Sequence, residues 1–215
     1  MTAGTRLGVW LIAAALTGCA YAPAYRPIGP PLDDKVFEAG IGAHGVIGQD
    51  LAGGGTSGWM QTQIAKDVSV VARGHFTQTL PWRGGGGFLQ DAQFGGALGL
   101  RGSYRAFDDL YFGGELLLDY TQFRSSAEGT VGHFLSGAFG FPVAERALPD
   151  LWVYVEPTIG AGWRFGDVDV PFGGYMEVPI GVAWRPKPNL MVVGEAGFAI
   201  PFAGGYGGVA VALRL

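Results

Sequence analysis

Apolar side chains recur at every second residue after several similar turns, and this two-residue period limits the fold more than any other feature. After Asp109, every second residue from Leu110 to Tyr120 is apolar or glycine, and the same holds from Leu151 to Trp163 after Asp150. The period is typical of β-strands, in which successive side chains point to opposite faces. The chain is therefore predicted to be all-β, with strands that have one apolar and one polar face.

The turns that precede these strands form a repeat. Arg105, Arg146 and Arg185 each begin the pattern Arg-x-x-x-Asp/Asn-Leu. Successive copies lie roughly 40 residues apart, a spacing that solenoids and propellers also show. Because the residues after each copy alternate, each repeat is predicted to be a β-hairpin. A fainter copy lies at Lys66-Asp67-Val68, and a charged residue follows six positions after the Asp or Asn of every copy, on the less apolar face: Arg73, Glu115, Glu156 and Glu195.

Ten such segments favour a closed barrel over a soluble sandwich. Their polar faces are rich in Gly and Ala with single charges, unlike the solvated face of a sandwich. No run after the N-terminal segment reaches the ~20 apolar residues of a membrane helix, and the apolar strips end in aromatic residues, as on the outside of a transmembrane barrel. We expect a single closed, antiparallel, up-and-down transmembrane β-barrel of ten strands, with eight as the other possibility. The predicted strands are 35–48, 57–65, 68–80, 92–105, 110–123, 130–144, 151–166, 172–185, 190–202 and 206–215.

The N-terminal segment resembles the signal peptide of a bacterial lipoprotein. Arg6 precedes the apolar run Leu7–Leu16, and Leu16-Thr17-Gly18-Cys19 matches all four positions of the lipobox, in which the cysteine is acylated. The resemblance implies a lipidated Cys19. We interpret residues 1–18 as a lipoprotein signal peptide, 19–34 as a lipidated, proline-rich tether and 35–215 as the barrel.

Residues 35–215 resemble the small outer-membrane β-barrel proteins of Gram-negative bacteria. The last strand alternates Val209, Val211, Leu213 and Leu215, which resembles the signal read by the barrel-assembly machinery, although that family usually ends in Phe. The resemblance implies the bacterial outer membrane as location, and outer-membrane lipids, the lipoprotein-sorting machinery and the barrel-assembly machinery as partners. With an even strand number both termini fall at the end with short turns, which is periplasmic in such barrels. The lipid-anchored N-terminus is therefore expected on the periplasmic side.

Long charged side chains on the polar faces are expected to point into the lumen. Opposite charges on neighbouring strands should pair there, because an unpaired charge in a narrow interior is costly. Side chains already fill an eight-stranded barrel, so we predict a largely plugged lumen and a structural or interaction role. A narrow pore for small solutes is the alternative. The predicted lumen charge network is Arg73, Arg101, Arg105, Glu115, Asp119, Glu156, Arg164, Glu177, Arg185 and Glu195.

No motif indicates an enzyme, and neither a catalytic residue, a metal nor a cofactor is predicted. The three histidines lack the spacing of metal ligands. His133 and Ser136 resemble the pair used by outer-membrane lipid A deacylases, but a separation of three residues places them on opposite faces of a strand. A net charge of −4 argues against nucleic acid as a partner. A lipid-anchored, lipocalin-like ligand-binding barrel is a further alternative, and it would have an apolar lumen and a polar exterior.

Overall fold

Antiparallel pairing of the alternating segments builds one continuous wall in the computed structural model. The structure describes residues 37–47, 51–81, 92–125, 129–166, 172–200 and 204–215. The predicted signal peptide, Cys19 and the tether therefore lie outside the described residues. No helix among the described residues is long and apolar enough to cross a membrane. The strands are β1 (Phe37–Ile47), β2 (Leu51–Ala65), β3 (Val68–Pro81), β4 (Ala92–Arg105), β5 (Leu110–Ser125), β6 (Thr130–Gly140), β7 (Val143–Leu148), β8 (Leu151–Val155), β9 (Thr158–Gly166), β10 (Phe172–Lys187), β11 (Leu190–Ile200) and β12 (Gly204–Arg214).

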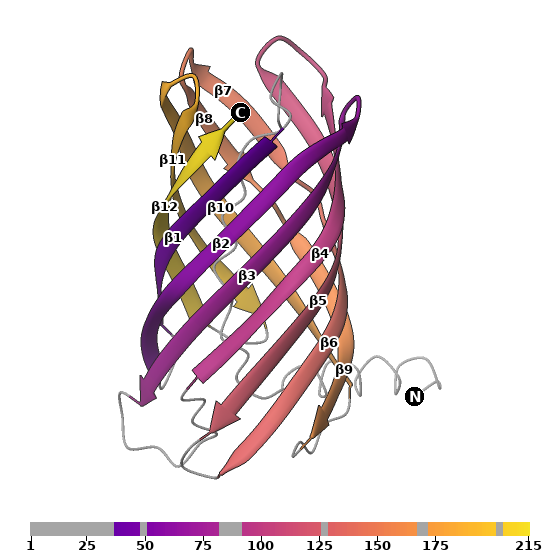
Figure 1. The fold of residues 1–215 in the computed structure, drawn as a ribbon, viewed down its shortest axis with the longest axis vertical. Helices are drawn as coiled ribbons and strands as arrows, with labels where there is room; N and C mark the ends of the chain where they lie inside the picture. The colour runs from indigo at the N-terminus through magenta and orange to yellow at the C-terminus, as the bar shows by residue number, and fades with distance from the viewer. Residues whose placement is uncertain (1–36, 48–50, 82–91, 126–128, 167–171, 201–203) are drawn as a thin grey trace, which may run out of the picture.

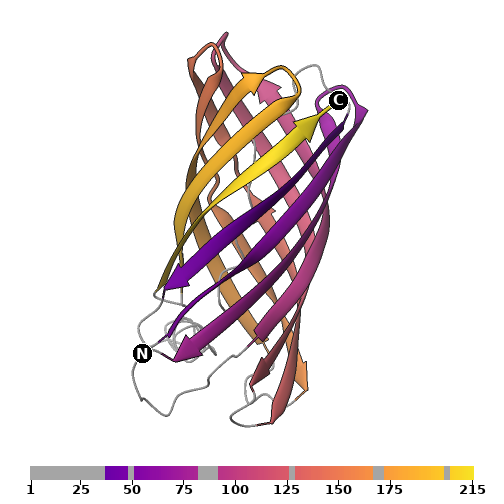
Figure 2. The same ribbon diagram turned by 60° about the vertical axis from the view of Figure 1, so that its left-hand side comes forward.

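The wall closes because the first and last strands pair with each other. β1 pairs with β12 over its length, from Glu38 opposite Arg214 to Ile47 opposite Gly205, and the two strands lie side by side in Figures 1 and 2. β6 and β7 together occupy one strand position beside β5, and β8 and β9 together occupy one beside β10. The closed antiparallel barrel therefore has ten strands, which confirms the predicted fold class.

Prolines divide the two interrupted strands. Pro142 lies between β6 and β7, and Pro157 lies between β8 and β9. Neither can donate a backbone N–H to the ladder, but both carbonyl groups accept hydrogen bonds. The Gly113 N–H donates to Pro142 O at 2.8 Å, and the Phe141 N–H donates to Pro157 O at 2.9 Å. Wall contacts thus continue across both breaks.

The two ends of the barrel differ. At one end the strands join through short turns that contain Asp67, Asp109, Asp150 and Asn189; we refer to it as the short-turn end. The opposite end, which we refer to as the loop end, carries the connections whose residues mostly lie outside the described ones. Successive connections along the chain thus lie at alternating ends of the barrel.

The predicted boundaries differ most from the structure at the start of β2. A loop was expected over 49–56, but β2 begins at Leu51 and pairs with β3 throughout this glycine-rich stretch. A Cβ atom at Gly55 would lie 1.9 Å from the Phe76 carbonyl oxygen, and one at Gly53 would lie 2.2 Å from that of Gln78. The glycines therefore permit a close approach of β3 rather than marking a loop.

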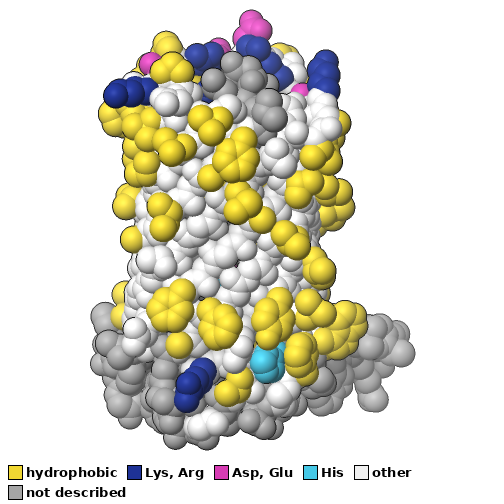
Figure 3. Space-filling model, viewed as in Figure 1, with side chains coloured by type: hydrophobic (Ala, Val, Ile, Leu, Met, Phe, Trp, Pro, Cys, Tyr) yellow, Lys and Arg dark blue, Asp and Glu magenta, His cyan; other side chains and the backbone are white. Residues whose placement is uncertain are grey.

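The predicted assignment of faces is confirmed along the wall. On β5, Leu116 and Leu118 are about 60% exposed, whereas their neighbours Glu115 and Leu117 are buried. Many hydrophobic side chains on the outside of the wall are exposed (Figure 3), and on the face shown Lys, Arg, Asp and Glu gather mainly at the short-turn end. An apolar exterior around a charged interior is the arrangement of a barrel that spans a membrane and the reverse of a lipocalin-like barrel.

Large aromatic side chains fill much of the interior by lying over glycines. A Cβ atom at Gly181 would fall 2.2 Å from the Tyr154 ring, and one at Gly40 would fall 2.2 Å from Trp59. Each ring thus lies flat over a directly paired residue that has no side chain, an arrangement known to stabilise glycine in sheets. The glycine content that the sequence shows is thereby explained in part by packing inside the barrel. The paired residues are Trp59 with Gly40, Phe123 with Gly132, Tyr154 with Gly181, Tyr175 with Gly160, and Tyr206 with Gly197.

Candidate functional site

The first charged cluster of the interior lies where the barrel closes. Glu38 on β1 and Arg214 on β12 stand opposite each other, and Arg214 Nε lies 2.8 Å from Glu38 Oε2 with both side chains fully buried. β2 supplies two further donors to Glu38 Oε1: Trp59 Nε1 at 2.8 Å and Gln61 Nε2 at 3.3 Å. We refer to Glu38, Trp59, Gln61 and Arg214 as the seam cluster. Glu38 Oε1 thus accepts two hydrogen bonds, while Oε2 forms an ion pair with Arg214 that lacks hydrogen-bond geometry, so one cation and two neutral donors compensate this buried charge.

A second cluster begins beside the first, with Arg73 opposite Trp59, and draws its members from four strand positions. Arg73 Nη2 on β3 lies 2.5 Å from Glu115 Oε1 on β5. Arg101 Nη2 on β4 lies 3.5 Å from Glu156 Oε2, at the junction of β8 and β9. Each carboxyl group also interacts electrostatically with both arginines. We refer to these four residues, two positive and two negative, as the central cluster.

Each acid of the central cluster accepts one hydrogen bond from an arginine, whereas Glu38 accepts two hydrogen bonds from β2. Glu115 Oε2 and Glu156 Oε1 are buried and have no hydrogen-bond donor among the described residues. Gly140 provides space for the pair, since a Cβ atom there would lie 2.9 Å from Glu156 Oε1 and 3.6 Å from Glu115 Cβ. Each acid is therefore paired with an arginine through one oxygen only.

Other predicted acids of the lumen are buried beside polar groups. Glu195 Oε2 accepts a hydrogen bond of 2.7 Å from the Tyr154 hydroxyl. Asp119 Oδ1 accepts one of 3.0 Å from the Thr121 hydroxyl. Glu177 is 3% exposed and also points inward. The acids that recur at one repeat position thus face the lumen, but they engage different kinds of partner.

The arginines that begin the repeated turns lie at the short-turn end rather than beside the central cluster. Arg105 and Arg146 have the same environment, since each guanidinium donates to a carbonyl oxygen three residues later, of Asp108 and Pro149, with Nη2 distances of 2.6 Å. Arg105 is also 3.8 Å from the Asp108 carboxylate, and its side chain is 54% exposed. These bonds explain the repeated spacing: the arginine caps its own turn.

Arginine–aromatic contacts occur at both ends of the lumen. The Arg185 guanidinium lies 4.0 Å from the centre of the Trp152 ring, and that of Arg146 lies 5.3 Å from it. Arg164, nearer the loop end, lies 5.7 Å from the Phe134 ring. Such cation–π contacts hold a cation in place without a carboxylate. Arg164 and Arg185 therefore contact aromatic rings as well as lying on the inward face.

The predicted lumen network lacks the residues of the seam cluster, among them its cation Arg214. Arg214 follows Ala210 and Ala212 on the alternating inward face of the last strand. The same two-residue period that located the other charges indicates its orientation, but nothing in the sequence indicates that Glu38 is its partner.

No arrangement resembling an active site is found in the described part of the chain. His133 lies on the outer face, whereas Ser136 is 2% exposed and points inward. Within the same residues, no group of three or more His, Cys, Asp or Glu side chains is placed to hold a metal ion.

Comparison with known proteins identifies the fold. No protein-family model and no curated protein matches the sequence. The outer membrane protease OmpT from Escherichia coli matches the structure with a TM-score of 0.50 and 9% identity, over 87% of this chain and 99% of that one. An outer membrane channel from Pseudomonas putida matches with a TM-score of 0.52 and 6% identity, over 91% of this chain and all of that one. The likeness is one of fold. A protease and a channel share it, so it does not assign an activity.

Proposed function

We propose that this protein is an outer-membrane β-barrel lipoprotein of a Gram-negative bacterium, with a closed lumen and a structural or interaction role. The observation that supports the proposal is that two buried charged clusters, and aromatic rings that lie over glycines, project into the interior. A barrel of this width has little interior space to begin with. Its surface for partners would then be the external connections at the loop end.

Electrical recording tests the closed lumen. The purified full-length protein in a planar bilayer should show no steady conductance. The double variant Trp59→Ala with Tyr154→Ala, which removes two rings from the interior, should conduct more than the wild type if packing closes the lumen. A large and reproducible conductance of the wild type would overturn the proposal and favour the narrow pore instead.

The lipid anchor is a separate part of the proposal, and the lipobox supports it. Acyl-chain labelling of the wild type in cells should mark Cys19, and Cys19→Ser should lose the label while the barrel still resists extraction with alkaline carbonate. Normal labelling of Cys19→Ser would exclude this anchor. Release of the wild type by carbonate after removal of the acyl chains would instead favour a soluble, lipid-anchored barrel.

We propose no catalytic role. The inward acids are engaged by arginine, tyrosine or threonine side chains, which is what a structural network requires. Asp91, Asp167 and Asp169 in the external connections lie outside the described residues. An assay of the purified protein against casein and against lipid A tests this point, and turnover of either substrate would contradict it.

A further inference from the structure

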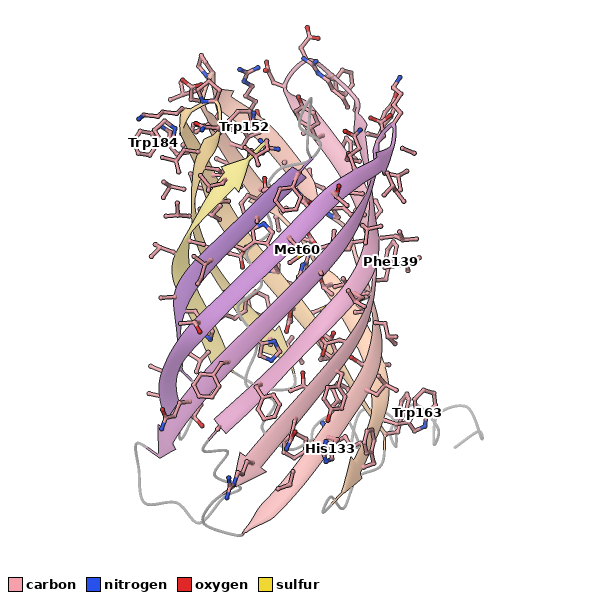
Figure 4. The ribbon with its side chains drawn as sticks, viewed as in Figure 1. Met60, His133, Phe139, Trp152, Trp163 and Trp184 are labelled. Carbon is pink, nitrogen blue, oxygen red and sulfur yellow. The ribbon has the colours of Figure 1, made fainter. Side chains whose placement is uncertain are left out.

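Three rings form a row on the outer face near the loop end. They are Tyr120 on β5, His133 on β6 and Phe165 on β9. The imidazole stacks on Phe165 with centroids 5.2 Å apart and planes inclined by 11°, and it lies 6.0 Å from the Tyr120 ring at 27°. Figure 4 shows His133 at this end of the barrel, opposite to Trp152 and Trp184. The imidazole is thus held between two rings within the aromatic border of the apolar wall.

The Tyr120 hydroxyl orients the imidazole. It lies 2.7 Å from His133 Nδ1, so when the hydroxyl donates to Nδ1 the ring hydrogen is on Nε2. Within the described part of the chain, Nε2 has no hydrogen-bond partner. A donor that is fixed in position at the edge of the apolar wall, with no acceptor among the described residues, can bind an acceptor supplied from outside the chain.

Arg124 lies beside this donor. His133 stands opposite Gln122, and Arg124 is the next outward-facing residue along β5. Diagonal neighbours of this kind lie roughly 7–8 Å apart, within reach of a long side chain. Arg124 is exposed and forms no ion pair among the described residues. Among the described residues no Asp or Glu lies on the outer face at the loop end, so none of them provides a counter-charge for Arg124.

We infer that Arg124 and His133 bind a phosphate group of a lipid in the membrane leaflet at the loop end. This inference rests on the proposed function for the assignment of that leaflet to the outer surface of the cell. The guanidinium fork matches phosphate oxygens in geometry and charge, and the Nε2–H supplies a further donor. A lipid fits better than free phosphate because Leu135 and Trp163, 40% and 64% exposed, cover the adjacent wall where acyl chains would pack.

Native mass spectrometry of the full-length protein in detergent tests the site with two matched lipids, lipid A and the same lipid without its phosphates. The wild type should retain lipid A about tenfold more than the dephosphorylated lipid, as expected for the loss of a charge-assisted hydrogen bond. Arg124→Gln and His133→Phe should each reduce this preference, and the double variant should abolish it. His133→Phe preserves the ring stack, and Lys187→Gln, at the short-turn end, should behave as the wild type.

Equal retention of the two lipids, or an unchanged preference in the double variant, would overturn the inference. Complete displacement of the lipid by inorganic phosphate would exclude a lipid as the specific occupant. A change in electrophoretic mobility on heating, measured for every variant, reports the folded barrel independently. A wild type without this behaviour would contradict the proposed function, whereas a folded barrel without lipid preference would contradict only the lipid site.

Discussion

The seam cluster and the central cluster are both buried groups of opposite charges, but they differ in how they are satisfied. Glu38 accepts two hydrogen bonds through Oε1, and its Oε2 forms an ion pair with Arg214 at 2.8 Å without hydrogen-bond geometry. Glu156 receives one arginine at 3.5 Å, and its other oxygen has no donor among the described residues. The seam residues are neighbours in the wall, whereas Arg73 reaches across β4, and Arg101, which stands opposite Glu115, bonds to Glu156 farther along the wall. Direct cross-strand neighbours thus give Glu38 more hydrogen-bond donors than Glu156 receives from a side chain farther along the wall.

The largest loss of stability is expected when the ion pair of the seam cluster is removed. Arg214→Met leaves the Glu38 carboxylate buried without its cation, which costs about 3–5 kcal/mol. Unfolding of the detergent-refolded barrel in urea measures the loss. Glu38→Gln combined with Arg214→Met removes both charges and should recover part of the stability. If the double variant is as unstable as the two single effects added together, the pair is not coupled.

A charge placed on the outside of the wall should reduce the stability of the barrel somewhat less. Leu116→Arg exposes a guanidinium to the membrane interior, at about 2–4 kcal/mol. Leu117→Gln, at the next residue but inside the lumen, should be better tolerated because polar groups are within reach. The yield of folded barrel in lipid vesicles compares the two variants. An equal loss of folded barrel in the two variants would contradict the assignment of Leu116 to the lipid-facing side of β5 and of Leu117 to the lumen.

The matched change in the central cluster should have a smaller effect than at the seam. Arg101→Met removes the closest cation of Glu156, but Arg73 still interacts with that carboxyl group. We expect a loss of about 1–3 kcal/mol, typical of a buried acceptor left unsatisfied. The same urea titration measures it. A loss as large as that of Arg214→Met would show that direct cross-strand pairing gives no advantage.

The packing of an aromatic ring over a glycine inside the barrel can be perturbed without a change of charge. Gly181→Val places a side chain where the Tyr154 ring lies and should cost about 1–3 kcal/mol through overpacking. Gly137→Val is the control, because a Cβ atom at Gly137 meets nothing within 4 Å. Thermal unfolding of the two variants in the same detergent makes the comparison. Similar melting temperatures would argue against a structural role for the rings that lie over glycines.

The smallest effect is expected at the short-turn end. Arg105 lies 3.8 Å from Asp108, and both side chains are largely exposed, so solvent screens this ion pair. Arg105→Ala should leave urea unfolding unchanged within error. A loss of unfolding free energy comparable to that of Arg101→Met would mean that Arg105 contributes to stability as much as the buried arginines do.

The alternation of side chains determined which way most of the wall residues point. Leu116 and Glu115 illustrate this: their order along β5 is enough to assign one to the outside and the other to the lumen, because side chains of a strand alternate by geometry. The repeated turns, capped by Arg105 and Arg146, also allowed ten strands to be counted. These are local properties, set by neighbours within a few residues of the chain.

Only the tertiary structure decided which residues meet. The partnership of Glu38 with Arg214 depends on closure of the first strand onto the last, and that of Arg73 with Glu115 depends on side chains that reach across β4. The placement of Tyr154 over Gly181 likewise follows from the register between β8 and β10. Shifting one strand by two residues against its neighbour leaves every side chain on the same face but changes the residue opposite to it. The sequence alone therefore assigns a face to each charge, and closure of the barrel selects its partner.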